Sequence, residues 1–84
     1  MWTVLLKKSV RRRVELIPNP DKERIKRAIN TLAYAPELLD IKPLKGRDDY
    51  RLRVGDWRLI LDIDENKKII TVNRLSSRGD VYKS

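Results

Sequence analysis

The stretch YRLRVGDWRLILDID, residues 50–64, predicts a β-hairpin and decides how the rest of the chain must fold. Its two arms alternate apolar and polar residues around Gly55-Asp56, and a two-residue connection led by glycine is typical of a tight type I′ or II′ turn. Because side chains alternate along a strand, this register gathers the apolar residues on one face, which we expect to meet the core. They are Tyr50, Leu52, Val54, Trp57, Leu59 and Leu61.

The opposite face of the hairpin carries arginines. The same register sets Arg53 directly opposite Arg58, and it sets Arg51 opposite Ile60. Like charges that face each other across an antiparallel pair cost roughly 0.2 to 1 kcal/mol, so stability does not account for this arrangement. Two interpretations stay open with equal weight: a solvated outer face, or a site for a polyanion.

The composition of the 84 residues restricts the kind of function. Twenty Lys and Arg against twelve Asp and Glu give a net charge of +8, which suits a nucleic-acid partner or an acidic protein partner. The absence of cysteine and histidine excludes disulfides, thiolate zinc sites and nucleophiles that are activated by histidine. We expect one domain over residues 1–84 with no metal and no cofactor. No apolar stretch reaches the ~20 residues that span a bilayer, so we expect a cytoplasmic protein without membrane contacts.

The N-terminal half predicts a strand followed by two helices. Residues 2–6 are apolar enough for a strand inside a sheet rather than at its rim. Ser9 is the expected N-cap of the first helix, and Asn19 that of the second, with Pro20 at its first helical position. The second helix ends before Pro36, and the two helices should pack as an antiparallel pair. The core-facing stripe of the second helix is Ile25, Ala28, Ile29, Leu32 and Ala33.

The C-terminal half predicts the rest of an antiparallel sheet. A short strand is possible at residues 41–44, a turn follows the hairpin at residues 64–67, and a last strand covers residues 69–75. The order β-α-α-(β)-β-β-β indicates an α+β fold, with the two helices on one face of a mainly antiparallel sheet of four to five strands. The other face of the sheet, which bears the arginines of the hairpin, should stay exposed.

The register of the last strand depends on the length of the turn before it. If that turn has two residues, Leu59 pairs with Val72, and Asn73 lies opposite Arg58 on the face with the arginines. A loop before the hairpin adds positive charge that suits contacts with phosphates. The basic residues of this loop and of the segment leading to it are Lys42, Lys45 and Arg47.

Over nearly its whole length the chain resembles the RelE/ParE superfamily of toxins from toxin–antitoxin pairs, and more closely the RelE branch. The resemblance rests on LIPNPDKERIKRAINTLAYAP (16–36), DIKPLKGRDDYRLRVGDWRLILDID (40–64) and SSRGDVYK (76–83). It implies a metal-independent endoribonuclease, an mRNA interferase that cuts mRNA in the aminoacyl site of the ribosome. It also implies two partners: mRNA on a 70S-type ribosome, and a RelB-like antitoxin whose helical segment wraps the toxin and keeps it inactive.

The resemblance also implies the residues of the site. RelE-like nucleases line a concave face with a basic loop residue, basic residues on both hairpin strands, and a C-terminal arginine and tyrosine. Many relatives carry a histidine where this chain has Ser77. By motif the catalytic residues here are Arg51, Arg53, Arg58, Arg78 and Tyr82, with Lys45, Arg47 and Asn73 as RNA-binding residues.

The chemistry of these residues suits RNA cleavage in part. Arginine stays protonated and is a poor base, but its planar fork can hold a phosphate and stabilise the charge of the transition state. Three alternatives stay open for Tyr82: the base, a ring that stacks on RNA, or a tail residue that packs on the sheet. Two other functions compete with the nuclease: a ParE-like inhibitor of DNA gyrase, and an inactive relative that only binds nucleic acid.

Overall fold

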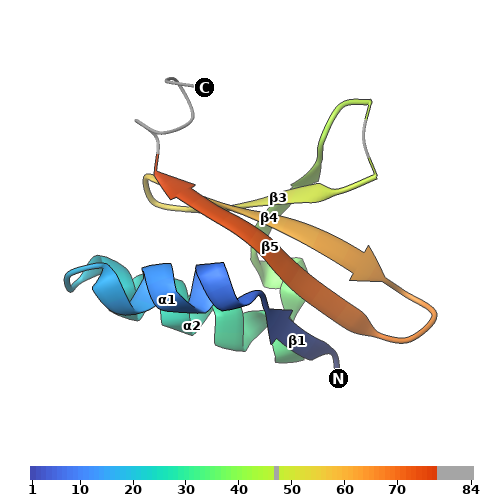
Figure 1. Cartoon of the computed structure of the whole chain (residues 1–84). Coiled ribbons are helices and arrows are strands. Elements are labelled where there is room, and N and C mark those ends of the chain that lie inside the picture. Colours follow the sequence, from blue (N-terminus) through green and yellow to red (C-terminus); the bar gives the residue numbers. More distant parts are fainter. Residues whose placement is uncertain (47, 78–84) are drawn as a thin grey trace.

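The computed structural model describes residues 1–46 and 48–77, and it shows a five-stranded sheet with both helices on one face (Figure 1). The strand order is β1-β5-β4-β3-β2, with β1 parallel to β5 and the other neighbours antiparallel. The predicted α+β fold is confirmed. The short strand that we predicted as possible at residues 41–44 forms one residue earlier, at Asp40–Pro43. In chain order the elements are β1 (Thr3–Leu6), α1 (Lys8–Leu16), α2 (Asp21–Tyr34), the short 3-10 helix η1 (Pro36–Leu38), β2 (Asp40–Pro43), β3 (Tyr50–Val54), β4 (Trp57–Asp64) and β5 (Ile69–Ser77).

The hairpin of β3 and β4 forms in the predicted register. Val54 pairs with Trp57, and Arg53 pairs with Arg58. Gly55 has a φ of 58°, whereas no non-glycine residue of this turn has a positive φ. A positive φ at the first central position alone is the geometry of a type II′ turn, which glycine adopts without steric cost.

The core lies between the helices and the inner face of the sheet. Its side chains recur every three or four residues along the helices and every second residue along most of the strands, so each element buries one face. On the surface, Lys26 Nζ lies 3.3 Å from Glu15 Oε2 and links the two helices. The buried apolar residues are Val10, Val14, Ile17, Ile25, Ala28, Leu32, Leu52, Leu59, Leu61, Ile70, Val72 and Leu75.

The turn between β4 and β5 is longer than predicted. Four residues, 65–68, connect the strands, and Lys68 takes a φ of 58°. Val72 therefore pairs with Leu61 rather than with Leu59, as we had predicted. A shift of two residues keeps the same side chains toward the core, so the prediction of the buried face holds although the predicted pairing was wrong.

A β-bulge changes the register of β5 a second time. Val72 and Arg74 pair with consecutive residues of β4, so Asn73 stands outside the ladder. Ser76 lies opposite Arg58, and the prediction that Asn73 would face this arginine is wrong. The extra residue places Arg74 on the outer face of the sheet, where a regular strand would have turned it toward the core.

Three local predictions at the N-terminal half were also wrong. The N-cap of α1 is Lys7 rather than Ser9, because the Lys7 N–H donates to Val72 O at 3.1 Å and the helix begins as soon as the chain leaves β1. The N-cap of α2 is Pro20 rather than Asn19, a position at which proline loses nothing by having no N–H. The strand β1 lies at the edge of the sheet with β5 as its neighbour, not inside it.

None of the helices within residues 1–46 and 48–77 has the length and the apolar character of a membrane-spanning helix.

Candidate nucleic-acid interface

The helices cover one face of the sheet and leave the outer face uncovered (Figure 1). The strand register places two rows of side chains across this outer face. Side chains that face each other on neighbouring strands have Cβ atoms about 5 Å apart, so each row forms a continuous surface. We call the four arginines of these rows, Arg51, Arg53, Arg58 and Arg74, the arginine face. The first row is Asp40, Arg53, Arg58 and Ser76, and the second is Lys42, Arg51, Ile60 and Arg74.

The arginines of the hairpin are held outward by the residues between them. Leu52 separates Arg51 from Arg53, and Leu59 follows Arg58. Both leucines have 0% exposure, so neither strand can rotate without removing a leucine from the core. The strands therefore fix the direction of the arginine side chains, which a loop would not do.

The electrostatics of the two rows are strongly positive. Asp40 is the acidic residue among the eight positions, and its Oδ1 lies 4.0 Å from Arg51 Nη2. The Nε atom of Arg51 is buried and has no hydrogen-bond partner within the described part of the chain. Arg53 and Arg74 are exposed, while Arg51 and Arg58 are partly buried. The surface thus offers several guanidinium groups to an anion from a rigid support.

The structure brings together only some of the predicted site residues. Arg51, Arg53 and Arg58 meet on the outer face, as their register requires. Lys45 is exposed on the loop between β2 and β3, which is at the opposite end of β3 from the Gly55 turn. The bulged residue, Asn73, lies away from Arg58. It lines a hollow of about 260 Å³ together with Ser9, Arg13 and its neighbour Arg74. The predictions for Arg47, Arg78 and Tyr82 lie outside the described residues.

Arg74 is a member of the arginine face that sequence reasoning missed. Regular alternation from Val72 places Arg74 on the core face, and only the bulge reverses that position. The sequence does contain a signal, since two adjacent polar residues, Asn73 and Arg74, interrupt the apolar positions of a strand. Lys42, which pairs with Arg51 from the edge strand β2, extends the same positive row.

The arrangement suits a phosphate ligand. Guanidinium groups present planar pairs of N–H donors that match the oxygens of a phosphate, and they keep their charge at any ordinary pH. In residues 1–46 and 48–77, no group of three or more His, Cys, Asp or Glu side chains could hold a metal ion. The described site can bind an anion and stabilise added negative charge, but arginine cannot take up a proton.

Similarity to known proteins was found by sequence and by structure. The sequence model described as ParE toxin of type II toxin–antitoxin system, parDE, matches residues 1–82. A Methanocaldococcus jannaschii protein assigned as the toxin RelE1 is 32% identical over 87 residues, which cover 99% of this chain and 97% of that protein.

Two solved complexes contain a chain with the same fold. The archaeal RelE–RelB complex of Pyrococcus horikoshii OT3 matches with a TM-score of 0.80 and 30% identity, covering 93% of this chain and 96% of that chain. The RelB–RelE antitoxin–toxin complex of Methanococcus jannaschii matches with a TM-score of 0.73 and 28% identity, covering 93% and 94%.

Proposed function

Because the chain belongs to the ParE and RelE family of toxins from type II toxin–antitoxin systems, we propose that it is an endoribonuclease that cuts mRNA in the aminoacyl site of the ribosome. The observation that carries the proposal is the arginine face. Arg53 and Arg58 lie opposite each other and repel, which lowers the stability of the fold. A bound polyanion offsets that repulsion. The same face lies on the side of the sheet opposite the helices (Figure 1).

The proposed reaction is attack of a 2′-oxygen on the adjacent phosphorus. The new P–O bond forms as the bond to the 5′-oxygen breaks, the proton of the 2′-hydroxyl passes to a base, and the leaving 5′-oxygen takes up a proton. Arg53 and Arg58, which are neighbours across two strands, hold the scissile phosphate and stabilise its added negative charge. Tyr82 is proposed as the base, and orientation of the RNA by the ribosome supplies part of the rate.

The test is translation on programmed ribosomes followed by primer extension. The wild-type protein should cut within the codon of the aminoacyl site, and Arg58→Ala should lose about 100-fold or more of this activity because a transition-state contact is removed. Tyr82→Ala should also abolish cleavage. Arg27→Ala, an exposed arginine on α2, is the matched control and should cleave normally. Intact mRNA with the wild-type protein would contradict the proposal.

A second candidate function follows from the match to the ParE family. A gyrase-binding toxin would have this fold without using the arginine face as a nuclease. The two candidates separate in a DNA cleavage assay with purified gyrase. A gyrase toxin should trap cleaved DNA, and Arg58→Ala should do so equally well, while an mRNA endonuclease should leave gyrase turnover unchanged.

We also propose that a RelB-like antitoxin binds this chain and keeps it inactive. The two archaeal relatives described above form complexes with RelB, and the net charge of +8 favours a partner that carries acidic residues. The measurement is the mRNA cleavage assay with increasing amounts of the cognate RelB-like antitoxin. Cleavage that persists at excess antitoxin would contradict this part of the proposal.

A further inference from the structure

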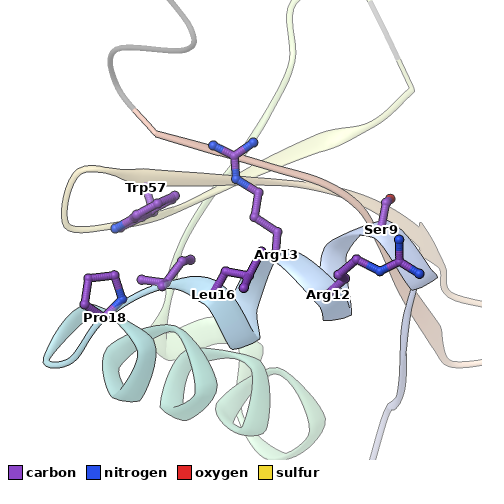
Figure 2. A pocket seen from close by; sticks show the side chains of 7 residues that line it. Ser9, Arg12, Arg13, Leu16, Pro18 and Trp57 are labelled. Carbon is purple, nitrogen blue, oxygen red and sulfur yellow. The ribbon is translucent and has the colours of Figure 1, made fainter.

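The hollow of about 260 Å³ lies where α1 passes the edge of β5, at the bulge of that strand, and we call it the bulge pocket. Figure 2 shows Ser9 and Arg13 on the side of α1 that faces the sheet, with Ser9 at the end of the helix away from Trp57. The guanidinium carbon of Arg13 lies 5.9 Å from the centroid of the Trp57 ring, so Arg13 shapes the wall and is not assigned to a ligand. The lining residues are Ser9, Val10, Arg13, Asn73, Arg74 and Leu75.

The end of β1 and the bulge of β5 create the pocket together. Leu6 forms the last pair of β1 with β5, opposite Val72, and the Lys7 N–H then donates to Val72 O at 3.1 Å. The chain leaves the sheet at this point and enters α1, which packs beside the part of β5 that β1 does not reach. The bulge sets Asn73 outside the ladder at the same place, so the side chain of an extra residue is available to the hollow.

The lining of the bulge pocket combines an apolar floor with a polar rim. Val10 and Leu75 belong to the core and are 2% and 4% exposed. The rim offers the hydroxyl of Ser9 and the amide of Asn73, and neither side chain forms a hydrogen bond to another residue within 1–46 and 48–77. Both groups can donate and accept a hydrogen bond, so they are able to bind a ligand that does the same.

This lining fits a nucleobase better than a phosphate group. The phosphate of a nucleic acid presents acceptor oxygens and is bound by cations and N–H donors, whereas a nucleobase combines apolar ring faces with an edge of donors and acceptors. The apolar floor suits the ring, and the hydroxyl and the amide suit the edge. The pocket is smaller than the roughly 300 to 1,000 Å³ of sites for larger organic ligands, so it suits a single base.

The bulge pocket borders the arginine face. Arg74 lines the pocket, and it also ends the row of the outer face that begins with Lys42. An RNA strand that follows this row therefore reaches the pocket once it has crossed β5. Arg74 can hold a phosphate there while the attached base turns into the pocket. Single-stranded RNA is commonly recognised in this way, through bases that leave the stack and expose their edges.

We propose that the bulge pocket takes one unstacked base of the bound RNA and that it favours adenine. The Asn73 Nδ2–H donates to N7 of the base, and Asn73 Oδ1 accepts from the N6 amino group, which is the usual pairing of an amide with adenine. The Ser9 hydroxyl adds a hydrogen bond to the same base, while Arg74 holds the phosphate of that nucleotide. The inference rests on the RNA binding proposed above and adds the place at which the protein distinguishes one base from another.

The test is fluorescence anisotropy of the full chain with two short single-stranded RNAs. Each is a run of uridines with one central purine, adenosine in the first and guanosine in the second, and both carry 2′-O-methyl groups so that the 2′-oxygen cannot attack. The wild-type protein should bind the RNA with adenosine about tenfold more tightly, because guanine has two acceptors where the amide needs one donor and one acceptor.

The variants should change this ratio of affinities. Asn73→Ala should bring the two RNAs to within about twofold of each other, because the bidentate contact is lost. Ser9→Ala should reduce the ratio to about threefold, as one hydrogen bond is removed. Asn73→Asp keeps the size of the side chain and loses the donor to N7, so it should remove the preference as well. The matched control is Asn30→Ala, which removes an exposed asparagine of α2 and should keep the full ratio.

Three results would overturn the proposal. If the wild-type protein binds both RNAs equally, the pocket does not distinguish bases although RNA binding stands. If the preference for adenosine persists in both Asn73→Asp and Ser9→Ala, another part of the protein makes the distinction. If the wild-type protein binds neither RNA at low salt, RNA binding by the arginine face fails and the pocket fails with it.

Discussion

Arg58 faces Arg53 on one neighbouring strand and Ser76 on the other. The pair of arginines repels, and threonine at either position would remove the repulsion while keeping a residue that suits a strand. We expect Arg58→Thr to raise the free energy of unfolding by roughly 0.2 to 1 kcal/mol in urea titrations and to abolish mRNA cleavage. In an Arg53→Thr background the gain should shrink, because the repulsion is already gone. Equal gains in both backgrounds would exclude this pair as the cause.

Arg74 is expected to contact RNA because the bulge turns it to the outer face. Its replacement by alanine should weaken binding of a short single-stranded RNA about tenfold, the value of one charge-assisted hydrogen bond. The slope of log K against log salt should become less negative by about 0.7, as one phosphate contact is lost. Fluorescence anisotropy at several salt concentrations measures both. Arg27→Ala on α2 is the control, and a slope unchanged by Arg74→Ala would remove this residue from the interface.

At the scale of elements, one hydrogen bond ties the β-hairpin to α2. The donor is Trp57 Nε1 and the acceptor is Asp21 Oδ2, which are 36 residues apart in the chain. Trp57→Phe keeps an aromatic ring but removes the donor, so we expect it to cost about 1 kcal/mol of unfolding free energy. Asp21→Ala should cost a similar amount, and the double variant should cost less than the two together. Strict additivity in urea titrations would show that this bond does not couple the elements.

The hairpin could be predicted because its register is decided locally. A two-residue turn led by Gly55 leaves a single pairing that buries Leu52 and Leu59, and that pairing places Arg53 beside Arg58. The stripe of α2 is equally local, since it depends on helical spacing alone. The fold class and the hairpin half of the candidate site follow from such short-range patterns.

The pairing of β5 could not be predicted in the same way. Val72 and Leu75 both face the core although they are three residues apart, a spacing that a regular strand cannot give. The bulge at Asn73 resolves the conflict, but its position depends on packing against β4 and β1 rather than on local propensity. The predicted partner of Arg58 was therefore wrong, and Arg74 was missed. Arg47, Arg78 and Tyr82 stay predictions.

For the whole molecule, the distribution of charge matters more than the net charge of +8. If RNA binds the two rows on the outer face, roughly five phosphates are neutralised and the slope of log K against log salt should be about −3.5 for single-stranded RNA. A triple variant on the other side of the molecule, with Arg24, Lys26 and Arg27 changed to alanine, should keep that slope. A slope that falls equally for any three lost charges would show diffuse attraction instead of a defined interface.

The pairing of β1 with β5 joins the first strand of the described residues to the last one. Long-range pairing of this kind forms late, because the second partner must exist before the first can be used. A nascent chain that lacks β5 also lacks one of the two strands that pair with β4, and it lacks part of the core. For a protein proposed to attack ribosomes, this order delays the complete outer face of the sheet, because Arg74 and Ser76 join the two rows only after β5 has been synthesised.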